Sequence, residues 1–206
     1  RAYTDLVWFD DEIDVLFAQD HFVAASVDDV ARPGEWARVP IARDRLVVAR
    51  DESLALALVR DACRHRGAAL FDSDEGVCES LAVTCPYHGW SYALSGTLMR
   101  APGACAHFDL SAHGLRAGAA WEDGPLVFVG ERRAESRWSR VPWLERVTPS
   151  SLRRARRVVW EVAANWKLLV ENFQESHHFP SVHPWLEART PWKRSAVQRR
   201  SRLAGV

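Results

Sequence analysis

The residues best suited to bind a metal lie in two short segments near the middle of the chain. The first reads Cys63-Arg64-His65, and the second, beyond residues 66–84, reads Cys85-Pro86-Tyr87-His88. A glycine follows each segment, Gly67 or Gly89, as is typical of a tight loop. Two such loops can approach one another and offer two thiolates and two imidazoles to a metal.

The spacing of these ligands indicates which metal they would hold. Structural zinc sites usually have two or more residues between paired ligands, so Cys-x-His is tight for one zinc ion. A [2Fe-2S] cluster suits the spacing better, because each loop can give its cysteine to one iron and its histidine to the other. We therefore favour an iron–sulfur cluster over a zinc site. Four cysteines are too few for a disulfide scaffold in 206 residues, and we expect Cys78 and Cys105 to be small buried thiols.

A second group of candidate ligands follows at Glu175-Ser176-His177-His178-Phe179-Pro180-Ser181-Val182-His183. Glu175 and His178 are three residues apart, and on one helix face the carboxylate can orient the imidazole. His178 and His183 could supply two members of a 2-His-1-carboxylate site, which leaves positions on Fe(II) open for dioxygen. Taken alone, histidines this close together are also common on surfaces and in cores. We expect His177 to be packed or solvated and not to be a ligand.

The two central segments resemble the cluster-binding loops of Rieske proteins, most closely those of bacterial Rieske non-heme iron oxygenases. The similarity extends over Cys63-Arg64-His65-Arg66-Gly67 and Cys85-Pro86-Tyr87-His88-Gly89-Trp90. Respiratory Rieske proteins have an additional cysteine in each loop, whereas this chain has Ala68 and Tyr87 there. The difference favours the oxygenase branch. The resemblance implies four cluster ligands, one pair for each iron: Cys63 with Cys85, and His65 with His88.

The C-terminal part resembles the start of the catalytic domain of Rieske oxygenase α subunits. The similarity lies in Asn165-Trp166-Lys167, Glu171-Asn172-Phe173 and the pattern Glu175-x-x-His178-x4-His183-Pro184. That domain has a helix-grip (SRPBCC-like) fold. By the resemblance, His178 and His183 bind mononuclear iron.

Residues around the expected iron have supporting roles by the same resemblance. Glu175 would link a cluster histidine to an iron histidine across a subunit boundary and carry electron transfer. Many relatives have Asp there, and Glu resembles the subgroup that oxidises quaternary ammonium compounds such as glycine betaine and carnitine. Asn172 and Glu171 are weaker candidates for hydrogen bonds near the iron. The family's third iron ligand is a carboxylate from far downstream, beyond Val206, and we expect Glu187 to be a surface residue.

A helix and a series of strands are expected to position the two central loops. Apolar residues recur at helical spacing between Asp5 and Gln19, and Thr4 is a suitable N-cap. Short β-rich runs separated by turn residues then predict a small antiparallel β domain that ends near Gly130. The expected strands are Phe22–Val27, Trp36–Val39, Leu46–Ala49, Leu54–Val59, Leu81–Thr84, Trp90–Leu94 and Leu126–Val129.

A strand and then a helix should position the second group of ligands. Val158–Val162 has the alternation of a strand, and Asn165 can cap a helix that must end or kink by Pro180. Together these elements predict an α+β chain that is mainly antiparallel β. We divide it into an N-terminal amphipathic helix at 1–20, a Rieske [2Fe-2S] domain at 21–130, a connector at 131–151 and the incomplete start of the catalytic domain at 152–206.

Charge also separates two parts of the chain and excludes some partners. Lys+Arg and Asp+Glu number 27 each, but residues 1–130 have 11 basic and 20 acidic residues, and the remainder has 16 and 7. We interpret the basic residues at 153–157 and 199–202 as a solvated face or a contact with an acidic partner surface, with no nucleic-acid partner. The longest apolar run, Leu54–Val59, is far shorter than the roughly 20 residues of a membrane span. No signal-peptide core follows Arg1, so we expect a cytoplasmic protein without membrane contact.

The resemblance implies the function of a Rieske-type mono- or dioxygenase. Electrons from NAD(P)H would arrive through a separate flavin reductase, directly or by way of a ferredoxin. The [2Fe-2S] cluster would pass them to mononuclear Fe(II), which activates O2 for hydroxylation or N-demethylation of a small aromatic acid or quaternary ammonium compound. Relatives with this electron path are homotrimers. The alternatives are a Rieske ferredoxin-like electron carrier, which has no need of the histidines near residue 180, and a structural zinc-binding module.

Overall fold

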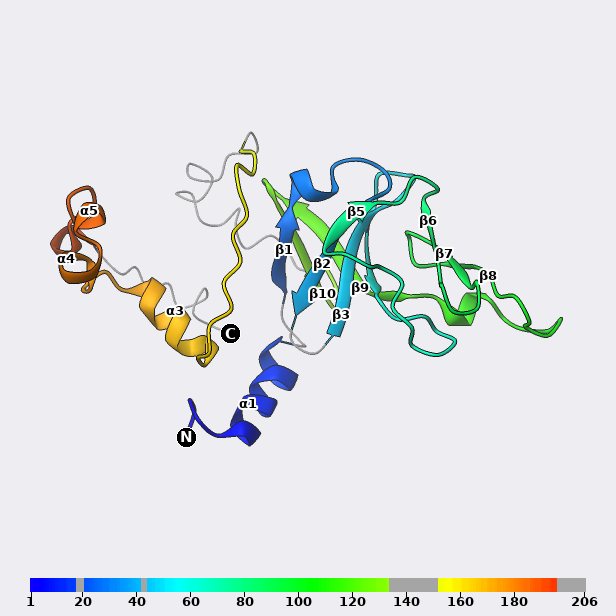
Figure 1. The fold of residues 1–206 in the computed structure, drawn as a ribbon, viewed down its shortest axis with the longest axis horizontal. Helices are drawn as coiled ribbons and strands as arrows, with labels where there is room; N and C mark the ends of the chain where they lie inside the picture. The colour runs from blue at the N-terminus through cyan, green and yellow to red at the C-terminus, as the bar shows by residue number, and fades with distance from the viewer. Residues whose placement is uncertain (18–20, 42–43, 134–151, 196–206) are drawn as a thin grey trace. The chain divides into compact units, whose positions relative to one another are not determined.

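The computed structural model describes residues 1–17, 21–41, 44–133 and 152–195 (Figure 1). The chain divides into two compact units. The larger unit is Ile13–Arg157, and the smaller unit combines Arg1–Glu12 with Val158–Val206. The first residues of the chain therefore belong to the same unit as its last residues. None of the described helices is long and apolar enough to span a lipid bilayer.

Within the described residues, the larger unit contains a seven-stranded antiparallel sheet and a three-stranded antiparallel sheet. The order in the large sheet is β1-β10-β9-β4-β3-β2-β5, and in the small sheet β6-β7-β8. The strands of the large sheet are β1 Phe22–Ser26, β2 Glu35–Ile41, β3 Asp44–Arg50, β4 Leu56–Arg60, β5 Glu75–Val77, β9 Arg116–Asp123 and β10 Leu126–Gly130. Those of the small sheet are β6 Ala82–Thr84, β7 Ser91–Ala93 and β8 Leu98–Arg100. The prediction of a mainly antiparallel β chain is confirmed.

Short helical turns complete the larger unit. A π-helical turn, η1, spans Ile13–Phe17, and two 3-10 turns, η2 and η3, span Val27–Val30 and Ser111–His113. The expected N-terminal helix corresponds to helical residues at Leu6–Glu12 and Ile13–Phe17, and its predicted end at Gln19 lies outside the described residues. The expected connector, from residue 134 on, and the basic residues at 199–202 also lie outside them.

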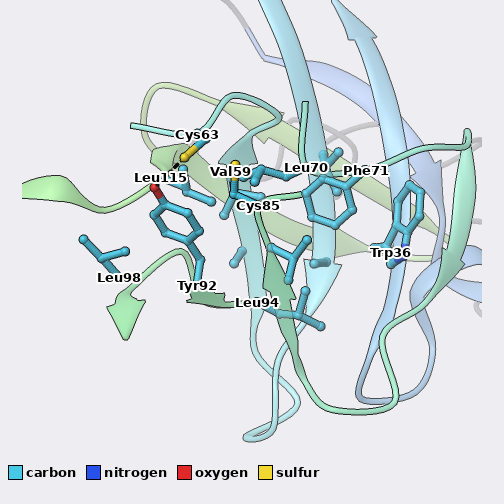
Figure 2. Packing of buried hydrophobic residues seen from close by; sticks show 14 of the residues in the cluster. Trp36, Val59, Cys63, Leu70, Phe71, Cys85, Tyr92, Leu94, Leu98 and Leu115 are labelled. Carbon is cyan, nitrogen blue, oxygen red and sulfur yellow. Dashed lines mark hydrogen bonds between the residues drawn. The ribbon is translucent and has the colours of Figure 1, made fainter. Parts of the chain in front are cut away.

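The core of the larger unit consists of two clusters on opposite faces of the large sheet. Successive strand residues point to opposite faces, so Val47 belongs to one cluster and Val48 to the other. The first cluster also includes residues of the small sheet and of both cysteine loops, among them Tyr92, Cys63 and Cys85 (Figure 2). The candidate cluster loops are therefore built directly onto a hydrophobic core.

The smaller unit is helical within the described residues. It contains α1 Leu6–Glu12, α3 Trp166–Gln174, α4 Phe179–Val182, α5 Pro184–Glu187 and the 3-10 turn η5 Trp192–Arg194. Asn165 caps α3 as predicted, because its side chain accepts a hydrogen bond from the Lys167 N–H (3.1 Å). The predicted cap of α1 is wrong. The Asp5 carboxylate, one residue beyond Thr4, accepts the N–H groups of Val7 (3.0 Å) and Trp8 (3.3 Å) instead.

Two further predictions about the smaller unit are wrong. Val158–Val162 forms no strand in the described part of the chain, and Trp160 is 77% exposed. A strand is stable only when a neighbour pairs with it, and no described segment does so. The helix ends before Pro180 as expected, but already at Gln174, and Glu175 is extended (φ −124°, ψ 160°), so Glu175 and His178 do not share a helix face. The Pro180 ring would clash with the carbonyl of Ser176 in a continuous helix, so the chain turns and restarts as α4 with the proline in its first turn.

Candidate metal centres

Each of the two cysteine loops is closed by the same pair of backbone hydrogen bonds. The N–H of Gly67 donates to the Cys63 carbonyl (2.8 Å), and that of Gly89 donates to the Cys85 carbonyl (3.0 Å). Each cysteine N–H in turn donates to the carbonyl of the residue after the glycine, at 2.8 Å in both loops. Gly67 and Gly89 have φ of 70° and 71°, a conformation that costs a residue with a Cβ free energy. The two loops are therefore close structural copies.

In both loops the cysteine side chain is buried and the histidine side chain is exposed. Cys63 and Cys85 are free thiols and only 3% exposed. His65 and His88 are exposed, and their ring centroids lie 4.6 Å apart. The His65 ring also stacks on Trp90, at 5.1 Å and 10°. The loops thus present an inner pair of sulfurs and an outer pair of imidazoles.

This donor set fits a [2Fe-2S] cluster. Among the described residues, no group of three or more His, Cys, Asp or Glu side chains converges as a single metal ion would require. A structural zinc site needs four such ligands at one point, whereas a Rieske cluster needs only two protein ligands at each iron. The buried thiol pair and the exposed imidazole pair meet the second requirement.

Two residues outside the predicted site hold the first loop. The Tyr92 hydroxyl lies 3.3 Å from Cys63 Sγ and accepts the Arg64 N–H (3.0 Å), and Figure 2 shows it pointing at the sulfur. Burial, followed by the contact with Cys63, raises the pKa of Tyr92, so its hydroxyl keeps its proton. Sequence reasoning placed residue 92 in a strand but did not single it out. The only signal was that alternation puts it on the same strand face as Trp90.

Asp61 fastens both ends of the first loop. Its carboxylate is fully buried and accepts the N–H groups of Leu70 (2.7 Å) and Phe71 (3.0 Å) through Oδ1. Its Oδ2 accepts from Arg38 Nη1 and Arg45 Nη2, both at 2.8 Å. A buried carboxylate needs such partners, because an unpaired charge in the interior is strongly unfavourable. The backbone on either side of the Cys63 loop is therefore fixed at one point.

The second group of candidate ligands lies close together as predicted, but Glu175 and His178 are not on one helix. Although Glu175 is outside any helix, its Oε1 lies 2.5 Å from His178 Nδ1. The rings of His178 and His183 have centroids 5.3 Å apart and meet edge to face. The hydrogen bond from His178, supported by the His177 N–H, lowers the pKa of Glu175. With Nδ1 occupied by the carboxylate, Nε2 of His178 is the nitrogen left to bind a metal.

The other candidate residues near this site differ in their exposure and hydrogen bonds. His177 is exposed, with its ring 5.0 Å from that of Trp192, as expected of a packed or solvated histidine. The carboxylate of Glu187 accepts the Trp192 N–H (2.9 Å). Glu171 accepts a hydrogen bond from Tyr3. Asn172 is exposed, and its side chain has no hydrogen bond within the described ranges, so its supporting role stays a prediction.

Two expectations about the larger unit can be checked directly. Cys78 is partly buried, which raises its pKa, but Cys105 is exposed, so the expectation of a buried thiol is wrong there. Cys105 lies in an irregular loop after β8 and belongs to neither hydrophobic cluster. The basic segment contacts acidic residues of its own unit, and the contact expected with an acidic partner surface stays a prediction. Arg154 forms an ion pair with Asp29 (2.5 Å), and its backbone N–H donates to Asp28 (2.9 Å).

Comparison with known proteins agrees with this arrangement. Residues 20–111 match the Rieske [2Fe-2S] domain, and residues 149–205 match the ring hydroxylating alpha subunit (catalytic domain). The chain is 29% identical over 193 residues to the carnitine monooxygenase oxygenase subunit of Escherichia coli (strain K12), covering 89% of this chain and 51% of that protein. It is 28% identical over 195 residues to the anthranilate 1,2-dioxygenase large subunit of Acinetobacter baylyi, covering 88% and 41%.

A solved structure of a quaternary ammonium Rieske monooxygenase, described in terms of carnitine oxidation and inter-subunit electron transfer, is also similar. It is 27% identical with a TM-score of 0.79, over 88% of this chain and 52% of that one. The chain therefore combines a Rieske [2Fe-2S] domain with part of a ring hydroxylating alpha subunit catalytic domain. It spans about half the length of the relatives it matches.

Proposed function

We propose that this chain is part of a Rieske-type oxygenase subunit that uses electrons from NAD(P)H, delivered by a separate reductase, to oxidise a small organic molecule with O2. The observation that carries the proposal is the presence of two different metal-suited sites in one chain. One has buried thiols and exposed imidazoles, and the other has two imidazoles with a carboxylate on one of them. A Rieske ferredoxin or a zinc module would not need the second site.

The first site is suited to receive electrons. The ligands we propose are Cys63, His65, Cys85 and His88, and the bound cluster would supply one-electron transfer. The chain itself keeps both sulfurs out of water and leaves the His65 and His88 edges accessible to an electron-donating flavin reductase or ferredoxin. Tyr92 holds a hydroxyl against the Cys63 sulfur and excludes water from that side.

The second site is suited to hold iron for oxygen chemistry. His178 and His183 are the ligands we propose from this chain, with a third carboxylate ligand from a later segment, and the bound Fe(II) would supply activation of O2 for hydroxylation or N-demethylation. Glu175 fixes the His178 ring by accepting at Nδ1, so that Nε2 is directed to the metal. We further propose that Glu175 connects this histidine to a cluster histidine of a neighbouring subunit in a homotrimer. The inter-subunit electron transfer described for the similar solved monooxygenase supports this path.

The substrate that we propose is a quaternary ammonium compound. Support comes from the similarity to a carnitine monooxygenase subunit and from a glutamate at position 175. The similarity to the anthranilate enzyme makes an aromatic acid the competing substrate class. We place the protein in the cytoplasm, where NAD(P)H and a reductase are available.

Metal analysis tests this function directly. The full-length protein would be purified anaerobically, assayed for iron, zinc and acid-labile sulfide, and examined by EPR after reduction with dithionite. Acid-labile sulfide with a Rieske-type signal, and more iron than the cluster requires, is the expected result. Oxygen uptake with a reductase, NADH and carnitine, glycine betaine or anthranilate would then assign the substrate class. Zinc without sulfide would overturn the proposal.

A further inference from the structure

Within the smaller unit, one carboxylate of the N-terminal helix α1 contacts the helix that precedes the proposed iron ligands. Glu12 accepts hydrogen bonds from Lys167 Nζ at 2.6 Å to each oxygen, and from Trp166 Nε1 at 3.0 Å. Trp8 Nε1, one turn earlier on α1, donates to the same carboxylate at 2.9 Å. Although Glu12 is on a short terminal helix, its side chain is only 11% exposed.

The chemistry of this contact requires a carboxylate of this length. Three N–H-bearing side chains use both oxygens of Glu12, and the Lys167 ammonium holds the pKa of Glu12 below its ordinary value. Glutamine offers a single acceptor oxygen and no charge, so it would leave a donor without a partner. Aspartate is shorter by one CH2 and would not reach the same donors.

A second contact joins the same two segments. The Tyr3 hydroxyl donates to Glu171, and Asn165 Nδ2 donates to the Tyr3 carbonyl (3.3 Å). The Lys167 ammonium lies 5.5 Å from the centroid of the Tyr3 ring, within cation–π distance. The N-terminal segment therefore contacts the N-cap, the first turn and the second turn of α3.

These contacts matter because α3 has little else to hold it. None of its nine residues is buried within the described part of the chain. Isolated helices shorter than about 12 residues are marginal in water, so α3 depends on such contacts. Its C-terminus leads directly into Glu175, and from there to His178 and His183.

We propose that Glu12 is a positioning residue for the iron site: it holds Trp166 and Lys167 at the start of α3, and so fixes the helix that presents Glu175, His178 and His183. The proposal rests on the proposed function, because that function assigns iron to these histidines. It adds that the N-terminal segment is a working part of the catalytic unit.

The test compares Glu12→Gln with Asp11→Asn in the full-length protein. Asp11 is the adjacent exposed carboxylate on α1 and makes no hydrogen bond or ion pair with α3 among the described residues, so it is the matched control. Two measurements are made on each variant: hydrogen exchange of the backbone amides of 166–174, and iron content relative to acid-labile sulfide after gel filtration. For Glu12→Gln we expect exchange in α3 to be about tenfold faster, from the loss of a charged hydrogen bond. We also expect iron beyond that of the cluster to be lost, with an unchanged cluster EPR signal.

The outcomes separate this proposal from the proposed function. Exchange and iron content equal to the Asp11→Asn values would overturn the positioning role. If the unaltered protein holds no iron beyond its cluster, the proposed function fails, but faster exchange in Glu12→Gln would still support the hold on α3. Should Glu12→Gln not fold, Lys167→Met removes the same ion pair from the other side. The same loss of iron with an intact cluster signal is then expected, and its retention would contradict the proposal.

Discussion

At the scale of single residues, the Tyr92 hydroxyl is placed to tune the proposed cluster. It lies 3.3 Å from Cys63 Sγ, and a hydrogen bond to a ligand sulfur stabilises the reduced, more negative cluster. Tyr92→Phe removes this bond and keeps the buried ring. We expect the reduction potential to fall by about 40 mV, the equivalent of a hydrogen bond of about 1 kcal/mol for one electron. An EPR-monitored redox titration measures it, and an unchanged potential would show that the hydroxyl does not bond to the sulfur.

Asp61, which matches no ligand pattern in the sequence, illustrates how a buried charge can fix a loop that carries ligands. Asp61→Asn loses the charge that pairs with Arg38 and Arg45 and turns an acceptor into a donor beside them. We expect the free energy of unfolding to fall by about 3 kcal/mol, from breaking one side of a buried ion network. Thermal or urea unfolding measures the change. Asp74, an exposed partner of Arg38, provides the control, since Asp74→Asn should change stability little.

The assignment of His178 as an iron ligand can be tested by comparing it with the adjacent histidine, His177. The Glu175 carboxylate orients the His178 ring through a hydrogen bond at Nδ1. The preceding residue, His177, is exposed and packs against Trp192. His178→Ala should lose the iron beyond that of the cluster and abolish oxygen uptake, because two ligands from this chain are needed to hold the metal. His177→Ala should keep both. Metal analysis with EPR decides the matter, and equal iron in the two variants would count against the assignment.

At the scale of elements, the position of β9 depends on a residue that strand propensity disfavours. Gly118 is paired within the large sheet, and a Cβ there would lie 2.4 Å from the Gly130 carbonyl oxygen. We expect Gly118→Ala to destabilise the protein by about 1–3 kcal/mol, because β9 and β10 must separate to admit the methyl group. Gly103→Ala meets no atom within 4 Å and serves as the comparison, with only the cost of its positive φ. Urea unfolding midpoints distinguish the two, and a Gly118→Ala midpoint no lower than that of Gly103→Ala would be contradictory.

Strands could be predicted from the sequence where their own side chains favour a strand, but not where neighbouring strands hold them in place. Runs such as Leu46–Ala49 are rich in β-branched and apolar residues, which predict a strand. Every predicted strand before Gly130 overlaps an observed one. The strand β9 was missed because Arg116–Asp123 is mostly small or charged and is held by its neighbours. Leu54 and Leu81 have positive φ and precede strands that were predicted to include them. Such backbone conformations are set by turns and not by side-chain type.

The sites were predictable to a similar degree, for different reasons. The ligands of each loop are close together in the sequence, so the cysteine and histidine pairs could be identified from residue type and spacing. The contact between Glu175 and His178 was expected on a helix but is made across a turn, because Pro180 forces α3 to end early. Residues that support a site through tertiary contacts, such as Tyr92 and Glu12, leave no local pattern. Their partners are distant in the chain, and only the fold brings them together.

At the scale of the whole molecule, the proposed electron path requires more than one chain. In the proposed function each subunit has a cluster site and an iron site, and Glu175 connects an iron histidine to a cluster histidine of a neighbour. One subunit variant, Cys63→Ser, would lack the cluster, and another, His178→Ala, would lack the mononuclear iron. Each alone should be inactive. Co-expressed and purified as mixed trimers, they should regain part of the oxygen uptake, because an intact cluster can lie beside an intact iron of another chain.

The control for that experiment adds Glu175→Ala to the Cys63→Ser subunit, which provides the only intact iron site. Iron should still bind there, since both histidines remain, but activity of the mixture should fall at least tenfold because the proposed connection between sites is gone. Oxygen uptake and iron content are measured on the same preparations. If mixed trimers stay inactive while each site is loaded, electrons must pass within one subunit, and the role of Glu175 as an inter-subunit bridge would be wrong. Recovery that survives the loss of Glu175 would keep the path between subunits and remove this residue from it.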